Sequence, residues 1–520
     1  MTEMNLHMTH RRRLAALACL VLTSACGDRE VPTSAGLQPV PVFLRRGLGA
    51  EPDTLDPQLA EDNAALAIAT ELHEGLTRTG PDGSARPGAA ESWLRSVDGR
   101  DYVFQLRAGL RWSDGQPLHA EHFATALRAL IAPGTTAPYA ALYGAVSSIE
   151  VLDERHIKVV LARPVPQLPA LLALPAASPR RAPTDPARAP GSGPFRLVDR
   201  DVGERLVLER NPHYWDADHV ALEGVTYLTV QSLDTELKLY RTGELDITSE
   251  VPNTHVAALR DELPAELRIT PYLGVYAYAV NMLRLSDRDA RTALAMAVDR
   301  ERITRQVTGA GERPAYGWIP DGMPGYVPAR FGWQSLPYAQ AATAARELWS
   351  SARSRGAAPD SITLCTDAST NHRRTAVALA DLWRSALGVQ TAIVELEWGV
   401  YLDMRRAPGE CDLLRLGWSA DFVDPEAFAD VFESANPQNT LGYHSERYDS
   451  LLSRSRSVTE VTERMRLLSA AETQLLEDVP VIPIFFRVSK HLVGRHVSGA
   501  SVNPLGQLPS RDLALRRGPR

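Results

Sequence analysis

The chain has 520 residues, of which 44% are hydrophobic and 23% are charged. These values are typical of a soluble globular protein with a substantial core and more than one lobe, and they argue against disorder. The formal net charge is -7, from 56 basic and 63 acidic residues. Because nucleic-acid binding needs a basic surface, we expect no nucleic-acid partner.

The first segment has the pattern of a secretory signal. Three arginines precede the apolar residues 14–22, which are too few to span a bilayer as a helix. Cys26 then follows small residues, as the lipidated cysteine does in a bacterial lipobox, although Thr23 stands where that motif usually has leucine. We predict an exported lipoprotein with signal peptide 1–26, lipidation at Cys26 and a polar tether at 27–41. A buried N-terminal helix is the alternative.

Two cysteines, Cys365 and Cys411, would remain in the mature chain. They could pair in an oxidising periplasm or could be small buried hydrophobic residues. We favour two free, buried thiols, because two strand cysteines pair only in a special geometry.

The first half of the chain alternates short elements and turns. Residues 102–106 are rich in aromatic and β-branched side chains and predict a strand that enters a turn at 111–115. Residues 156–161 and 206–209 alternate in the same way, whereas 290–298 have alanine and leucine at helical spacing.

The second half contains the clearest unit. Residues 361–366 predict a strand, 373–387 an amphipathic helix stopped by Gly388, and 389–396 another strand. This order indicates a right-handed crossover in a parallel sheet, with 413–416 as a neighbouring strand. The fold class is therefore α/β.

Ligands of such sheets bind beyond the carboxyl ends of the strands. The loops after Thr366 and near Trp418 are therefore the places where we expect a site. Arg415 lies inside a predicted strand, where an unpaired charge is costly, so it should contact either an acid or a ligand.

No catalytic or metal-binding signature is present. The sequence contains no metalloprotease, nucleophile-elbow, phosphate-loop or paired-cysteine motif. We therefore predict a protein that is not an enzyme and that needs no metal or cofactor.

A series of short motifs runs along most of the chain. They are Glu-Pro-Asp-Thr-Leu-Asp-Pro at 51–57, Leu-His-Glu-Gly-Leu at 72–76, Pro-Gly-Ala-Ala-Glu-Ser-Trp at 87–93, Arg-Trp-Ser-Asp-Gly at 111–115, Gly-Ser-Gly-Pro-Phe at 191–195, Asn-Pro-His-Tyr-Trp at 211–215 and Gly-Trp-Ser-Ala-Asp at 417–421. In this order they resemble the oligopeptide- and dipeptide-binding proteins of ABC importers, and the oligopeptide branch most.

The resemblance implies a two-lobed, three-domain periplasmic-binding-protein fold (type II, cluster C) that closes as a hinged trap over a ligand cleft. The implied domains are a discontinuous lobe I of 42–75, 179–272 and 487–520, an inserted domain II of 76–178, and a lobe II of 273–486.

The resemblance also implies that the peptide's ammonium binds to Asp421, with Trp418 and Ala420 of the same motif beside the ligand. From the residues alone, Asp421 could instead cap a helix ahead of Pro425, and Trp418 could be ordinary core. A charge-assisted bond to the ammonium is worth about 1.5–3 kcal/mol net.

The ligand's carboxylate requires a cation, for which Arg415 and His372 resemble family positions. Arg405 or Arg406 is a further candidate that is harder to align, because this sequence carries an extra residue nearby. Their alternative role is solvated surface charge, which is the stronger reading for the neighbouring Arg406.

Other residues resemble stretches that line the family's cleft: Glu61, Asn63, Tyr139 and Phe485. Phenylalanine at 485 and 486, where the pattern usually has tyrosine, suggests a preference for apolar side chains, which equal affinity for polar and apolar side chains would contradict.

One departure from the family concerns a disulfide. The resemblance implies one between the positions that look to be held here by Gly274 and Ser419. Because both partners are replaced, we expect packing alone to stiffen the motif.

The predicted function is a monomeric, periplasmic substrate-binding lipoprotein that captures short peptides and delivers them to the permease of an ABC importer. The same fold with another cargo, such as a nickel complex, haem, a sugar or an opine, is one alternative. A periplasmic chaperone is another.

Overall fold

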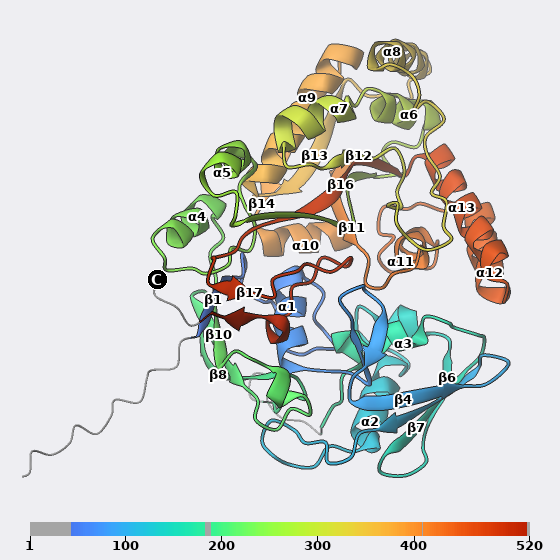
Figure 1. The fold of residues 1–520 in the computed structure, drawn as a ribbon. Coiled ribbons are helices and arrows are strands. Elements are labelled where there is room, and N and C mark those ends of the chain that lie inside the picture. Colours follow the sequence, from blue (N-terminus) through green and yellow to red (C-terminus); the bar gives the residue numbers. More distant parts are fainter. Residues whose placement is uncertain (1–42, 182–188, 408, 517–520) are drawn as a thin grey trace, which may run out of the picture. The chain divides into compact units, whose positions relative to one another are not determined.

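A computed structural model describes residues 43–181, 189–407 and 409–516 (Figure 1). The predicted signal peptide 1–26, the lipidation site Cys26 and the tether 27–41 lie outside the described residues. No helix in the described ranges is long and apolar enough to cross a membrane.

Two four-stranded sheets form in the first half of the chain. One has the order β1 (Leu44–Gly47), β10 (Gly224–Leu228), β9 (Arg205–Arg210), β8 (Phe195–Asp201), with β1 parallel to β10. The other is antiparallel, with the order β4 (Ala90–Arg95), β5 (Asp101–Leu106), β7 (His156–Leu161), β6 (Val146–Val151). Alternate residues of β5 and β7 are buried, as their period-2 patterns require. The strands predicted at 102–106, 156–161 and 206–209 are confirmed.

The third sheet has six strands and positions the candidate site. Its order is β12 (Arg313–Pro314), β16 (Val481–Leu492), β11 (Leu267–Val280), β15 (Leu413–Ser419), β13 (Ser361–Asp367), β14 (Gln390–Leu396). Strand β13 is parallel to both β14 and β15, whereas β11 runs antiparallel to β15 and β16. The three strands predicted around 361–416 are confirmed, but the sheet is parallel only at this edge.

Helices cover one face of this sheet. α6 (Arg288–Met296), α8 (Tyr338–Ser354) and α9 (Thr370–Leu387) share a buried apolar cluster with β13 and β15 (Figure 1). The helix predicted at 373–387 is confirmed, with its start three residues earlier. It ends at Gly388, whose φ of 73° is a left-handed conformation that glycine adopts without steric cost.

The remaining elements connect and cover these sheets. The helices are α1 (Asn63–Leu72), α2 (Ala120–Leu130), α3 (Leu168–Leu171), α4 (Leu233–Arg241), α5 (Val256–Glu262), α7 (Arg300–Arg302), α10 (Trp398–Arg406), α11 (Glu426–Ala429), α12 (Glu446–Ser457) and α13 (Val461–Asp478). The short strands are β2 (Thr77–Thr79), β3 (Ala85–Pro87), β17 (Val497–Ser498) and β18 (Ala514–Leu515).

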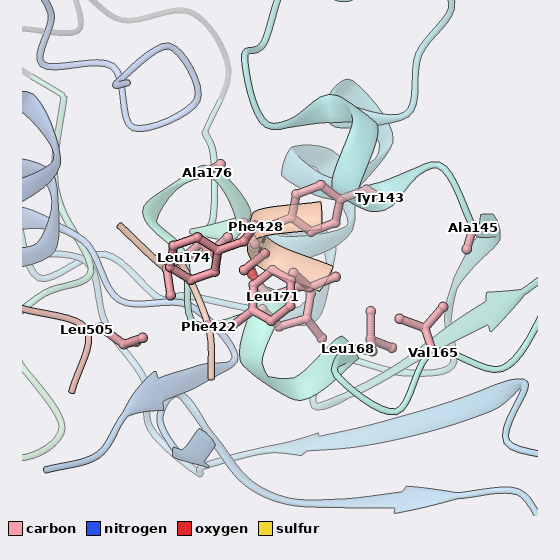
Figure 2. Close-up of a cluster of buried hydrophobic side chains, with 14 of the residues drawn as sticks. Tyr143, Ala145, Val165, Leu168, Leu171, Leu174, Ala176, Phe422, Phe428 and Leu505 are labelled. Atoms are coloured by element: carbon pink, nitrogen blue, oxygen red, sulfur yellow. Dashed lines mark hydrogen bonds between the residues drawn. The ribbon is translucent and has the colours of Figure 1, made fainter. Parts of the chain in front are cut away.

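The largest apolar core joins segments that the predicted domain boundaries separate. Phe422 and Phe428 pack beside Leu171 and Leu174 in one buried cluster, which Figure 2 shows in close-up. Full burial of a side chain of this size contributes about 1.5–3 kcal/mol. The loop after β15 is therefore held firmly against the segment around α3.

The cysteines at 365 and 411 form a disulfide, so the prediction of two free thiols is wrong. Their Cα atoms are 5.9 Å apart, although 46 residues separate them in sequence. The register of the two parallel strands brings the cysteines together. Cys365 in β13 lies beside Leu414 of β15, and Cys411 is in the turn that leads into β15, three residues before Leu414.

Candidate functional site

One edge of β15 has no strand beside it where the Gly-Trp-Ser-Ala-Asp motif begins. β13 pairs only with Leu413 and Leu414, whereas β11 accompanies β15 along its whole length to Ser419. In the part of the chain that the structure describes, residues 415–419 therefore have a strand on one side only.

The direction of the backbone groups follows from one hydrogen bond. The amide of Ala420 donates to the carbonyl of Leu273 in β11 at 2.8 Å. Because successive residues of an antiparallel pair point their backbone groups to opposite edges, Gly417 and Ser419 point theirs away from β11. The same edge exposes the carbonyl of Arg415, which accepts the Tyr401 hydroxyl. The N–H and C=O groups of Gly417 and Ser419 have no partner among the described residues on this edge.

Asp421 lies where this edge ends. Its carboxylate is partly buried and accepts a hydrogen bond from the Tyr139 hydroxyl at 3.3 Å. Burial raises the pKa of Asp421 to about 7, against the opposing effect of that hydrogen bond. Within residues 43–181, 189–407 and 409–516, no Lys, Arg or His forms an ion pair with it. A carboxylate so placed favours a cationic ligand.

The helix-capping alternative for Asp421 is wrong. The helix that follows is α11, and the carboxylate that accepts the amide of its first residue, Glu426, belongs to Asp424, at 2.9 Å. Asp424 also pairs with Arg464 at 2.7 Å. Asp424 therefore has the role that this alternative gave to Asp421, and Asp421 makes neither of these contacts.

Trp418 and Ala420 hold the motif in place. The Trp418 indole donates to the Ala427 carbonyl at 2.6 Å, and its ring packs at the border of the large apolar core while staying partly exposed. Ala420 is 4% exposed and its amide is used by β11. Trp418 thus has both a core contact and an accessible surface.

Arg415 meets an acid, as its place in a strand predicts. It is 8% exposed, and its Nε lies 2.8 Å from the Asp367 carboxylate at the end of β13. His372, near the start of α9, places its Nδ1 2.9 Å from both oxygens of that carboxylate. The Arg415 guanidinium and the His372 contact hold the pKa of Asp367 well below its usual value despite burial.

Aromatic rings enclose this cluster. The Arg415 guanidinium lies 5.1 Å from the Tyr401 ring and 5.7 Å from the Trp398 ring, within cation–π range. The Phe485 ring stacks on Tyr276 at 4.7 Å, and Tyr276 lies 5.3 Å from His372. Phe485 is buried, so it supports the cluster through Tyr276.

Arg405 and Glu61 lie near these groups. Arg405, on α10, is partly buried, and its guanidinium forms no hydrogen bond or ion pair within the described ranges; burial lowers its pKa. Glu61 pairs with Arg406, which has a partner despite being 59% exposed. Asn63 begins α1 and is exposed.

The positions of the missing disulfide face each other. Gly274 of β11 is the register partner of Ser419 of β15. A Cβ on Gly274 would come within 2.6 Å of the Tyr272 ring, so this ring fills the space that a side chain at 274 would need. Strand pairing joins the two positions, and the Tyr272 ring packs beside Gly274.

Sequence reasoning did not name Asp367, Tyr401 or Arg487. Asp367 was within reach, because it directly follows the strand predicted at 361–366, and the loop after that strand was predicted to hold a site. Tyr401 carried no signal, since its role depends on the direction of one carbonyl. Arg487 lies in β16, 72 residues from Arg415, and only the sheet brings them together.

The described residues contain no group of three or more His, Cys, Asp or Glu side chains arranged to hold a metal ion.

Comparison with known proteins identifies the family of this chain. Residues 84–440 match the family model for the middle region of bacterial extracellular solute-binding proteins, family 5. The chain belongs to this family.

Relatives cover almost the full chain. The periplasmic oligopeptide-binding protein OppA of Salmonella typhimurium is 32% identical, over 98% of this chain and 99% of that protein. The probable deoxycholate-binding periplasmic protein YgiS of Escherichia coli is 31% identical, over 98% and 99%. The structure of Haemophilus influenzae OppA in complex with the peptide RPPGFSPFR is similar, with a TM-score of 0.86, 29% identity, and coverage of 91% of this chain and 99% of that one. The two-lobed periplasmic binding fold is thereby established for this chain.

Proposed function

We propose that this protein is the peptide-binding receptor of an ABC importer. It captures short peptides and delivers them to a permease of membrane domains with ATPase subunits. One observation carries the proposal: an unpaired strand edge, at residues 415–419, ends at a carboxylate that has no cation partner in the described chain.

The free strand edge can bind the main chain, which all peptides share. The outward N–H and C=O groups of Gly417 and Ser419 can bind the main chain of an extended peptide, as in strand addition. Asp421, just beyond them, would receive the ammonium, and Trp418 and Ala420 would border the first residues. The Tyr139 hydroxyl donates a hydrogen bond to the Asp421 carboxylate.

The predicted cationic side chains would bind the ligand's carboxylate. Arg405 has no partner of its own among the described residues, which makes it the most available of the predicted cations. Arg415 and His372 both contact the Asp367 carboxylate, which offsets part of their positive charge. They would therefore attract a ligand carboxylate less strongly than Arg405 would. Glu61, Asn63 and Phe485 would shape the surroundings rather than bind charge.

Another cargo is the main alternative, and one relative is named as a probable deoxycholate-binding protein. A bile acid, haem, a sugar or a nickel complex has no need of a free carboxylate at Asp421, because none carries a primary ammonium. An opine also lacks a primary ammonium, since its amine is substituted. A chaperone role would leave the end of the strand edge without a defined partner.

Further expectations complete the proposal. The protein acts in the periplasm as a monomeric binding protein and not as an enzyme, and a lipid on Cys26 anchors it. Its lobes follow the predicted boundaries, with 76–178 as the inserted domain between the segments of lobe I and with 273–486 as lobe II.

Titration calorimetry tests the function. The protein is unfolded and refolded to remove endogenous ligand, then titrated with di- to pentapeptides and with their N-acetylated forms. We expect micromolar or tighter binding of the free peptides and strong weakening by acetylation. Equal affinity for acetylated and free peptides would refute the role of Asp421, and absence of binding for all peptides would refute the peptide cargo.

A further inference from the structure

Arg487 lies in β16 opposite an irregular stretch of β11. The register pairs Pro271 with Val488 and Val275 with Phe486, so residues 272–274 all face Arg487. Extra residues in one strand of a pair bend it and change the direction of nearby side chains. This bulge occurs beside Ser419, at the end of the free edge of β15.

The bulge supplies a support for the Arg487 side chain. The guanidinium carbon lies 5.5 Å from the centre of the Tyr272 ring. That ring occupies the space beside Gly274, where any side chain would collide with it. The absence of a side chain at 274 therefore allows Tyr272 to hold Arg487 in place.

The guanidinium groups of Arg487 and Arg415 converge on Gly417. If Gly417 had a Cβ, Nη1 of Arg415 would be 3.0 Å from it and Nη1 of Arg487 would be 3.6 Å from it. Two cations thus lie on one face of β15, beside the residue whose backbone groups point to the free edge.

The two charges differ in their partners. Arg415 is paired with Asp367. Arg487 is partly buried and forms neither a hydrogen bond nor an ion pair with the residues that the structure describes. Glu250 lies near enough for Arg487 to contribute to the lowering of its pKa, but its carboxylate contacts Lys490 at 3.1 Å. Arg487 is the charge that remains available.

We propose that Arg487, together with Arg415, forms an anion site over Gly417 that binds a carboxylate of the ligand. The inference rests on the peptide-binding function proposed above and deepens it. The carboxylate is either the peptide's C-terminus or an acidic side chain at the same depth.

The spacing selects a length for ligands held at both ends. Gly417 and Asp421 are four residues apart, and an extended chain spans at most about 3.3–3.6 Å per residue. A peptide whose ammonium is at Asp421 and whose terminal carboxylate is at Gly417 therefore has about three or four residues.

The test compares Ala-Ala-Ala with its C-terminal amide by titration calorimetry, on the wild type, Arg487→Gln and Arg487→Lys. Arg447→Gln, an exposed arginine on α12, is the matched control. We expect amidation to weaken wild-type binding about tenfold or more, as for loss of a charge-assisted hydrogen bond. In Arg487→Gln the preference for the free acid over the amide should fall to the part that Arg415 alone supplies, whereas Arg487→Lys should restore part of the lost preference.

A hexapeptide amide with glutamate or glutamine at position four separates the two sources of carboxylate. A glutamate preference that Arg487→Gln removes assigns the site to side chains as well. If neither carboxylate depends on Arg487, or if Arg487→Gln weakens acid and amide equally, the anion site is refuted. Binding that responds to N-acetylation but not to amidation refutes this inference alone, and no binding by any peptide refutes the proposed function as well.

Discussion

Peptide affinity should fall steeply as the pH is lowered from 7 to 5, because the ammonium needs an ionised partner. Burial raises the pKa of Asp421 to about 7 in the ligand-free protein. The carboxyl group is thus half ionised at pH 7 and only about 1% ionised at pH 5. The peptide's own amine stays protonated through this range, with an ordinary pKa of about 7.7–8.0.

The size of the effect depends on the pKa of Asp421 in the free and in the peptide-bound protein. Ionisation of the free protein alone gives a roughly 40- to 50-fold loss of affinity between pH 7 and pH 5. A bound ammonium lowers the pKa of a neighbouring carboxyl by about 1–3 units, and a bound value near 5 would recover about half of that loss. We therefore expect about a 20-fold rise in Kd. Protonation of His372 would strengthen carboxylate binding at low pH, so it cannot produce this loss.

Calorimetry of Ala-Ala-Ala at pH 5, 6 and 7, in two buffers of different ionisation enthalpy, measures both the affinity and the protons released. Wild-type protein should release a proton on binding at pH 6, and the pH dependence should disappear in Asp421→Asn. A Kd that is unchanged or lower at pH 5 would show that Asp421 does not bind the ammonium.

Three further predictions concern stability. Without ligand, Asp421→Asn should raise the free energy of unfolding at pH 8 by about 1–2 kcal/mol, less than the roughly 4 kcal/mol that a three-unit pKa shift would give for a fully buried group. The sign follows from the raised pKa, because the ionised carboxylate destabilises the fold above pH 7, whereas near pH 4 the group is protonated and has little effect. Urea denaturation at pH 8 and pH 4 measures the difference. An equal gain in the free energy of unfolding at both pH values would contradict the prediction. Replacing Cys365 and Cys411 together with serine should cost about 4 kcal/mol, because the disulfide closes a loop across 46 residues, and an unchanged urea midpoint would contradict this. Asp367→Asn should cost about 3–5 kcal/mol in thermal denaturation, since it leaves Arg415 buried without its acid, and a melting temperature equal to that of the wild type would refute the pairing.

Local patterns in the sequence predicted the elements well. The alternation at 102–106 and 156–161 predicted strands, and Gly388 predicted the end of α9, because each depends only on neighbours in the chain. The charge of Arg415 inside a strand predicted an acid partner, which is Asp367.

Register between distant strands could not be predicted. The disulfide depends on the alignment of β13 with β15, and the convergence of Arg487 with Arg415 depends on the order β16, β11, β15. The free edge of β15 likewise requires knowing that the pairing of β13 with β15 stops at Cys365 and Leu414. These facts are set by tertiary pairing, about which local pattern carries no information.

The covalent brace lies at the opposite end of β15 from the proposed ammonium site. Cys411 ties the start of β15 to β13, close to the Asp367 and Arg415 pair, whereas the family resemblance implies a disulfide at the positions of Gly274 and Ser419. Here those positions are joined only by strand pairing and by the Tyr272 ring. Because the same ring supports Arg487, the space freed beside Gly274 is occupied by a group that orients a cation. If the proposed anion site is correct, a side chain at 274 would displace the Tyr272 ring and so weaken the support of Arg487.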